Sequence, residues 1–119
     1  MTLLVPVGNG GQKYINDPWC GFVPPATLWL EFLKGFEKIY KSQNEQKIPR
    51  ELPILFIAGS LDPIGNKTLG VKAMIKRLTK LGLNEITNIF YEDARHELFN
   101  EINHDEVFKD LVDWLNAHI

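Results

Sequence analysis

The stretch "LPILFIAGSLDPIGN", residues 52–66, decides the fold class of this 119-residue chain. Residues 54–58 form a continuous apolar run that Gly59 closes. A strand that is apolar on both faces is typical of a buried parallel sheet, because helices then cover both faces. A turn follows, since an aspartate before a proline, here Asp62 before Pro63, favours one. We therefore predict a buried strand that ends in a polar loop carrying Asp62.

The chain then alternates between helix and strand. Residues 67–81 have apolar side chains at helical spacing, with Gly82 as a stop signal. "EITNIFY", residues 85–91, predicts a second strand, and a last helix should begin near Asn103 and Glu106, which have capping-box spacing. The apolar residues predicted to face inward are Leu69, Met74, Ile75, Leu78 and Leu81 on the first of these helices and Val107, Phe108, Leu111, Val112 and Leu115 on the last. The β-α-β-α order predicts an α/β fold with two parallel strands and a right-handed crossover.

The N-terminal half of the chain has a different pattern. Residues 1–25 contain many glycines and prolines, which predicts an irregular, loop-rich segment. From residue 26 to about residue 41, apolar side chains recur at helical spacing and predict an amphipathic helix. A polar connector, residues 42–51, follows. We therefore divide the chain into a helical connecting segment, residues 1–52, and a β-α-β-α part, residues 53–119.

Composition excludes several classes of protein. The formal net charge of −2 argues against a nucleic-acid binder, which usually has a basic surface. The single cysteine, Cys20, excludes an intrachain disulfide and fits a reducing compartment. No apolar stretch approaches the ~20 residues that a membrane span needs, and the N-terminal apolar run is too short for a signal peptide. With one cysteine and scattered histidines we expect no metal site, and we expect a cytoplasmic protein without a membrane span.

A polar residue follows each predicted strand: Asp62 comes after the first and His96 after the second. Ligands of open α/β sheets bind outside the carboxyl ends of the strands. Neighbouring strands are only ~4.8 Å apart, so an aspartate and a histidine on adjacent loops can meet. An aspartate bonded to Nδ1 fixes the tautomer of a histidine that acts as a base. Alternatively, His96 could be a surface residue paired with Glu92, Asp93 or Glu97, and Asp62 could be only a turn former.

Several of these segments resemble a known family. "PILFIAGSLDPIGN" (53–66) and "FYEDARHELFNE" (90–101) together look like the C-terminal part of an α/β-hydrolase, in particular of the serine lipases and esterases that include monoacylglycerol lipases and lysophospholipases. "YINDPWCGF" (14–22) and the helix after it look like the end of that group's lid. The resemblance covers nearly the whole chain and implies a partial α/β-hydrolase fold. It also implies hydrolysis of a lipid-like monoacyl ester without a cofactor, with Asp62 and His96 as catalytic residues.

The chain departs from this family in one respect. The family order is Ser, Asp, His, with the serine in a G-x-S-x-G elbow between a strand and a helix. No G-x-S-x-G occurs in the sequence, and its two serines are Ser42, in the polar connector, and Ser60, in the loop of Asp62. We therefore expect the nucleophile and the earlier strands to lie N-terminal to Met1. By itself the chain should be inactive, supplying Asp62 and His96 to a serine carboxylic-ester hydrolase.

Two other interpretations remain. The chain could be a non-catalytic interaction module, which pairs with a second copy or with an N-terminal companion chain that covers the exposed edge of the strand at Ile54, because a two-stranded sheet leaves its edges unpaired. It could also be an unrelated doubly wound module, in which Asp62 and His96 would lie beyond hydrogen-bond reach of each other.

Three aromatic residues could line an acyl-chain pocket or belong to the core: Trp19, Phe22 and Trp29.

Overall fold

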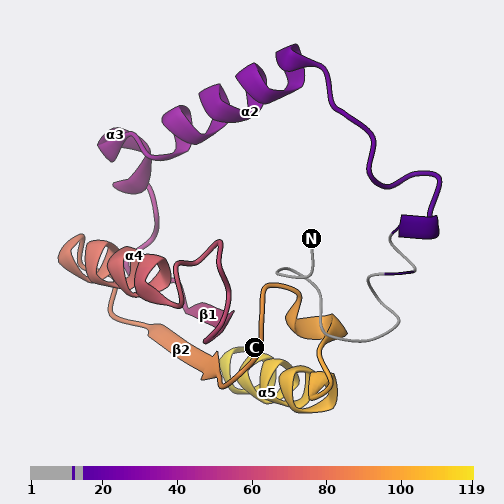
Figure 1. Cartoon of the computed structure of the whole chain (residues 1–119). Helices are drawn as coiled ribbons and strands as arrows, with labels where there is room; N and C mark the ends of the chain where they lie inside the picture. The colour runs from indigo at the N-terminus through magenta and orange to yellow at the C-terminus, as the bar shows by residue number, and fades with distance from the viewer. Residues whose placement is uncertain (1–11, 13–14) are drawn as a thin grey trace.

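A computed structural model of the chain describes residue 12 and residues 15–119. The elements follow one another as α2 (Ala26–Ile39), α3 (Ser42–Glu45), β1 (Ile54–Gly59), α4 (Leu69–Lys80), β2 (Ile86–Tyr91), the 3₁₀ helix η1 (Leu98–Asn100) and α5 (His104–His118) (Figure 1). Most of the loop-rich segment predicted over residues 1–25 lies outside the described residues. Of its described part, residues 12, 15 and 16 are helical and residues 17–25 contain no helix or strand.

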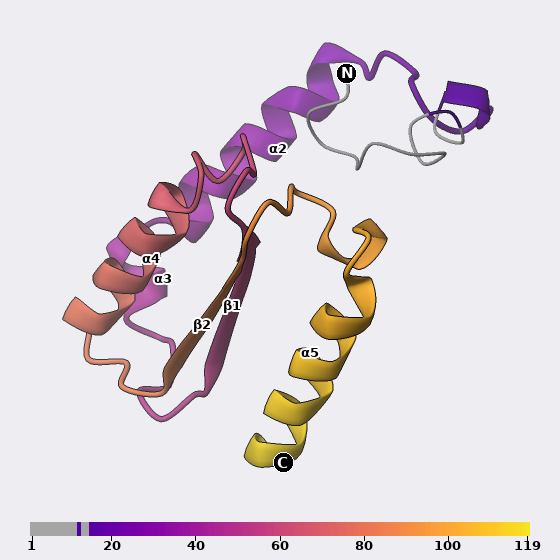
Figure 2. The same cartoon turned by 60° about the horizontal axis from the view of Figure 1, so that its bottom comes forward.

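The two strands form a parallel sheet, as the sequence predicts. The register runs from Ile54 opposite Ile86 to Gly59 opposite Tyr91. Helix α4 covers one face of this sheet and α5 covers the other (Figure 2). This arrangement of three layers is what strands with apolar residues on both faces require. The predicted α/β fold class is thus confirmed, and both strands end at the same edge of the sheet.

The hydrophobic core lies between the sheet and α5. Its buried residues are Tyr91, Ala94, Leu98 and Val107, with Ile57 and Ile89 packed against them. On the predicted inner face of α5, Val107 is fully buried and Leu111 is half-buried, as expected. Phe108, Val112 and Leu115 are exposed, so the prediction is wrong for these three. Apolar residues cover more than one side of α5, and only one side of a helix can pack on a flat sheet.

The start of α5 also differs from the prediction. Asn103 is the N-cap residue, but its side chain makes no capping hydrogen bond to the backbone. Its Nδ2 instead donates to the Glu106 carboxylate at 3.0 Å. The predicted capping box is therefore wrong. The reason is the backbone of Asn103, which has φ −95° and ψ 26° rather than the extended conformation that N-cap residues usually have.

Helix α4 packs on the other face of the sheet. Of its predicted inward residues, Leu78 is buried and Met74, Ile75 and Leu81 are half-buried, whereas Leu69 is exposed. The helix begins at Leu69 rather than at residue 67, because the three preceding residues, 66–68, have positive φ angles of 47°, 51° and 72°. It ends as predicted, with Gly82 in the left-handed region at φ 91°.

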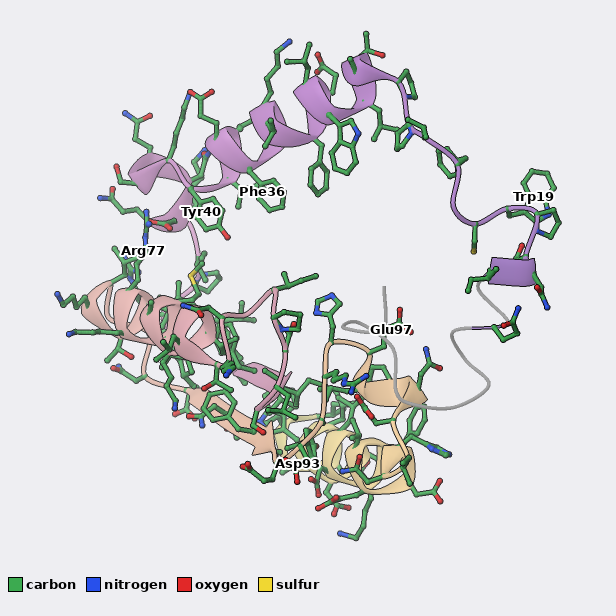
Figure 3. The ribbon with its side chains drawn as sticks, viewed as in Figure 1. Trp19, Phe36, Tyr40, Arg77, Asp93 and Glu97 are labelled. Carbon is green, nitrogen blue, oxygen red and sulfur yellow. The ribbon has the colours of Figure 1, made fainter. Side chains whose placement is uncertain are left out.

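The predicted polar connector contains the short helix α3, which the sequence pattern did not indicate. The Glu45 carboxylate is buried and binds the Arg77 guanidinium of α4. Arg77 also donates to the backbone carbonyl of Tyr40, just after α2. Figure 3 shows Tyr40 and Arg77 where the end of α2 approaches α4. The end of α2 and the whole of α3 are therefore attached to the sheet through α4.

Helix α2 forms as predicted, but none of its residues is buried. We call its apolar side chains the α2 apolar face: Leu28, Trp29, Leu30, Phe32, Leu33, Phe36 and Ile39, all exposed. Along this face the rings of Trp29, Phe32 and Phe36 follow one another at centroid distances of 6.1 and 4.7 Å. Trp19 and Phe22 are exposed as well, so the three aromatic residues singled out in the sequence do not belong to the core.

None of the described helices is long and apolar enough to cross a membrane.

Candidate active site

The loops that follow the two strands are held together by backbone hydrogen bonds. The N–H of Ser60, the first residue after β1, donates to the Tyr91 carbonyl at 2.8 Å. The next N–H, of Leu61, donates to the Ala94 carbonyl at 2.9 Å. The loop after β1 therefore continues alongside the loop after β2. This continuation carries Asp62 toward His96.

Asp62 lies buried in a tight turn. Its Oδ1 accepts a hydrogen bond from the Ile64 N–H at 2.8 Å, and its backbone carbonyl accepts one from the Lys67 N–H at 2.9 Å. An aspartate side chain that bonds to the backbone two residues on is a common way of closing a turn. Asp62 is thus a turn former, as its place before Pro63 predicts, and its second carboxylate oxygen remains available.

That second oxygen, Asp62 Oδ2, lies 3.0 Å from His96 Nδ1. This distance is within the range of a hydrogen bond to a charged group. The interpretation as an unrelated module, in which the two residues lie out of reach, is therefore wrong on this point. In the described part of the chain His96 makes its ion pair with Asp62 and with none of the acidic residues next to it in the sequence.

The electrostatics of Asp62 favour the ionised carboxylate. Burial by itself raises the pKa of Asp62, but hydrogen bonds from His96 and from the Ile64 and Gly65 N–H groups lower it by more, and the charge on a protonated His96 adds to this. The net result is a pKa of Asp62 below its ordinary value. An ionised Asp62 can only accept hydrogen bonds, so the proton of a neutral His96 ring belongs on Nδ1. The lone pair of Nε2 is then available to take a proton.

A surface hollow of about 310 Å³ lies beside His96. It is lined by Ile57, His96, Glu97, Leu98, Phe99 and Asn100. Three of these residues are apolar, and the His96 side chain is 44% exposed. The arrangement is a histidine at the edge of a hollow lined by both apolar and polar side chains. Its ring is accessible to a reacting group, whereas its aspartate partner is shielded from solvent.

Comparison with known proteins identifies the family. The model of the family described as "Serine aminopeptidase, S33" matches residues 10–103. The chain belongs to this family of α/β-hydrolases. The resemblance of the strand-loop segments to an α/β-hydrolase is thus confirmed, and the two-stranded sheet with its helices is part of an α/β-hydrolase fold.

A solved structure supports the same conclusion. The chain is similar to a highly thermostable carboxyl esterase from Bacillus coagulans, whose crystal structure contains glycerol, with a TM-score of 0.78 and 29% sequence identity. The match covers 90% of this chain and 35% of the esterase chain. The chain therefore spans about a third of the length of this relative. No curated protein matches the chain.

The described residues contain no serine arranged as a hydrolase nucleophile. The Ser60 hydroxyl accepts a hydrogen bond from the Asp93 N–H at 2.9 Å, and no hydrogen bond joins it to His96. Ser42 lies in α3, outside the two loops. Cys20 is not activated either, because desolvation and the neighbouring Asp17 carboxylate raise the pKa of its thiol. Within residue 12 and residues 15–119 there is also no cluster of three or more histidine, cysteine or acidic side chains that could hold a metal ion.

Proposed function

We propose that this chain supplies the aspartate and the histidine of a serine carboxylic-ester hydrolase. The observation that carries the proposal is the 3.0 Å contact between Asp62 Oδ2 and His96 Nδ1, beyond the carboxyl ends of two parallel strands. Membership of the α/β-hydrolases supports it, because triads of this kind place the aspartate and the histidine after the nucleophile in chain order. The likeness to a carboxyl esterase favours an ester as substrate.

The proposal gives each of the two residues a role, which their geometry supports. His96 Nε2 takes the proton of a serine hydroxyl while the serine oxygen attacks the ester carbonyl carbon. His96 then gives this proton to the leaving alcohol, and an acyl-enzyme remains. In the second half of the reaction His96 takes a proton from water, the resulting hydroxide releases the carboxylic acid, and the proton returns to the serine. Asp62 holds the ring with Nδ1 protonated and stabilises the imidazolium in both halves.

We propose a lipid-like monoacyl ester as the substrate. The hollow beside His96 offers the apolar side chains of Ile57, Leu98 and Phe99 to such a molecule. The α2 apolar face offers a larger apolar surface in the segment that resembles a lid. In this proposal residues 1–52 are lid-derived, residues 53–119 are part of the catalytic core, and the enzyme acts in the cytoplasm.

The serine has to come from a segment that precedes these strands in the fold. Within the described residues β1 pairs only with β2, so the other edge of β1 has no strand beside it. Exposed apolar side chains also lie on α2 and, with Phe108, Val112 and Leu115, on α5. We propose that an α/β segment with a G-x-S-x-G elbow covers this edge, as part of the same polypeptide or as a companion chain.

Labelling with a fluorophosphonate probe tests the proposed function. The natively purified protein is incubated with the probe, and the intact mass of every polypeptide present is measured. We expect an adduct on a serine of a G-x-S-x-G segment. His96→Gln should reduce the labelling rate roughly 10³-fold or more. His118→Gln, at the exposed end of α5, is the matched control and should label at the wild-type rate.

Two outcomes would contradict the proposal. An adduct on Ser60 would make this chain its own source of the nucleophile. No adduct on any polypeptide would favour the second candidate function, a non-catalytic interaction module. That candidate is favoured by the unpaired edge of β1 and by the exposed α2 apolar face, which need a second copy or a companion chain to cover them. A stable monomer at micromolar concentration that binds no apolar dye would exclude it.

A further inference from the structure

We propose that Ser60 is a positioning residue, which holds His96 against Asp62 by joining the two loops that carry them. This inference rests on the proposed function, because it concerns the same pair of residues. No motif in the sequence indicates a positioning role for Ser60. The structure indicates one through the contacts of its hydroxyl and of its backbone.

Ser60 is bonded at two points, to the last residue of β2 and to the loop that follows it. Its backbone N–H donates to the Tyr91 carbonyl at 2.8 Å, and its Oγ accepts from the Asp93 N–H at 2.9 Å. The first bond continues the strand pairing, and any residue could make it. The second bond needs a side-chain acceptor at this position. Asp62 lies two residues beyond Ser60 and His96 lies three residues beyond Asp93, so the hydroxyl fixes the two loops immediately before their functional residues.

The residue that donates to Ser60 has an unusual backbone. Asp93 has a positive φ of 57°, in the left-handed region that few non-glycine residues adopt, although aspartate does so more often than most. Such a conformation persists where surrounding contacts stabilise it. The hydrogen bond from the Asp93 N–H to Ser60 is one such contact. Without it, the turn that leads to His96 would lose a constraint at the point where the backbone changes direction.

The preceding residue explains why the loops come so close. A Cβ atom on Gly59 would overlap with the backbone carbonyl oxygens of Ala94 and Arg95. The loop after β2 therefore passes directly over the end of β1, and only glycine leaves room for it. Ser60 is then the first residue after β1 whose side chain can bond to this loop. Gly59 permits the loop after β2 to pass close to the end of β1, and the Ser60 hydroxyl stabilises this arrangement by accepting the hydrogen bond from Asp93.

The test uses the full chain and the tautomer of the His96 ring, measured by ¹⁵N NMR at about pH 9, where an ordinary histidine is neutral. Ser60→Ala should lower the ratio of the Nδ1–H to the Nε2–H form about five-fold, the factor that corresponds to one ordinary hydrogen bond. Ser60→Thr, which keeps the hydroxyl, should restore the ratio. Ser42→Ala, at the other serine of the chain, is the matched control and should leave it unchanged.

Asp62→Asn separates this inference from the proposed function. If Asp62→Asn leaves the His96 tautomer unchanged, the Asp62–His96 pair and the proposed function fail together. If Asp62→Asn changes the tautomer but Ser60→Ala does not, only the positioning role fails.

Hydrogen exchange of the wild-type chain needs no variant: the Asp93 amide should exchange at least ten-fold more slowly than that of an exposed loop residue. Exchange at the unprotected rate would also overturn the inference.

Discussion

The buried Glu45 carboxylate accepts two hydrogen bonds from Arg77, from Nε at 3.0 Å and from an Nη nitrogen at 2.8 Å. The same Nη nitrogen donates to the Tyr40 carbonyl at 3.2 Å, and the guanidinium lies 5.8 Å from the centre of the Tyr40 ring. A charged group at 7% exposure needs such partners, because an unpaired buried charge is strongly unfavourable. This pair therefore holds α2 and α3 onto α4.

Replacing Glu45 should destabilise the chain. Glu45→Gln keeps the shape but removes the charge, and it leaves Arg77 with a weaker acceptor. We expect the free energy of unfolding in urea to fall by about 1 to 3 kcal/mol. Asp113→Asn is the matched control: Asp113 pairs with Lys109 at 2.7 Å on the exposed side of α5. It should have little effect, since solvent screens exposed pairs, and equal losses in the two variants would contradict the role of burial.

The Asp62–His96 pair should make stability depend on pH in acid. The pKa of Asp62 in the folded chain lies below its ordinary value. The carboxylate therefore stabilises the fold above about pH 3.9, its usual value in an unfolded chain, and this contribution is lost as the pH falls through the lower folded pKa. Asp62→Asn should lower stability at pH 7 by about 1 to 3 kcal/mol and remove this part of the acid dependence. Urea unfolding between pH 7 and about pH 2 measures both effects.

The control for this measurement is Asp105→Asn. The Asp105 carboxylate is 98% exposed at the start of α5, beside His104. This variant should keep the acid-dependent loss of stability that Asp62 causes. An Asp62→Asn curve that runs parallel to the wild-type curve over the whole range would contradict the prediction.

Gly59 and Gly35 should respond in opposite directions to the same substitution. Gly59→Ala places a methyl group against the Ala94 and Arg95 carbonyls, and overpacking of this kind costs about 1 to 3 kcal/mol or more. Gly35 lies within α2, where a Cβ atom would meet nothing within 4 Å. Gly35→Ala should therefore stabilise the helix by about 0.5 to 1 kcal/mol. Thermal unfolding measures both changes, and a neutral Gly59→Ala would contradict the close approach of the two loops.

The α2 apolar face should make the chain associate when nothing covers it. Phe32 is 53% exposed between Trp29 and Phe36, so Phe32→Glu places a charge in the middle of this face. We expect the variant to bind less apolar dye and to sediment as a smaller species than the wild type. Lys76→Glu, on the exposed side of α4, is the control for a change of charge. Unchanged association of Phe32→Glu would show that another surface, such as that of α5, drives self-association.

Local patterns predicted most of the elements correctly. The apolar run before Gly59 predicted β1, and the helical spacing after residue 67 predicted α4; the structure contains both, with Gly82 after the end of α4. The shift of the start of α4 to Leu69 follows from the left-handed backbone of residues 66–68. Asparagine adopts this conformation more often than most residues, but Lys67 and Thr68 gave no signal for it. Helix α3 was missed because its four residues are polar and give no apolar pattern; contacts such as that of Glu45 with Arg77 make it part of the fold.

The sequence by itself determined the order β-α-β-α, the parallel direction of the strands and the position of Asp62 and His96 after the strand ends. These features depend on residues that are close together in the chain, and the spacing of such residues can be read from the sequence. Only the tertiary structure decided that residues 34 positions apart meet at 3.0 Å, that Ser60 and Gly59 hold their loops together, and that Val107 is buried while Val112 is exposed. Each of these depends on strand register and on helix rotation against the sheet, which packing between distant segments sets.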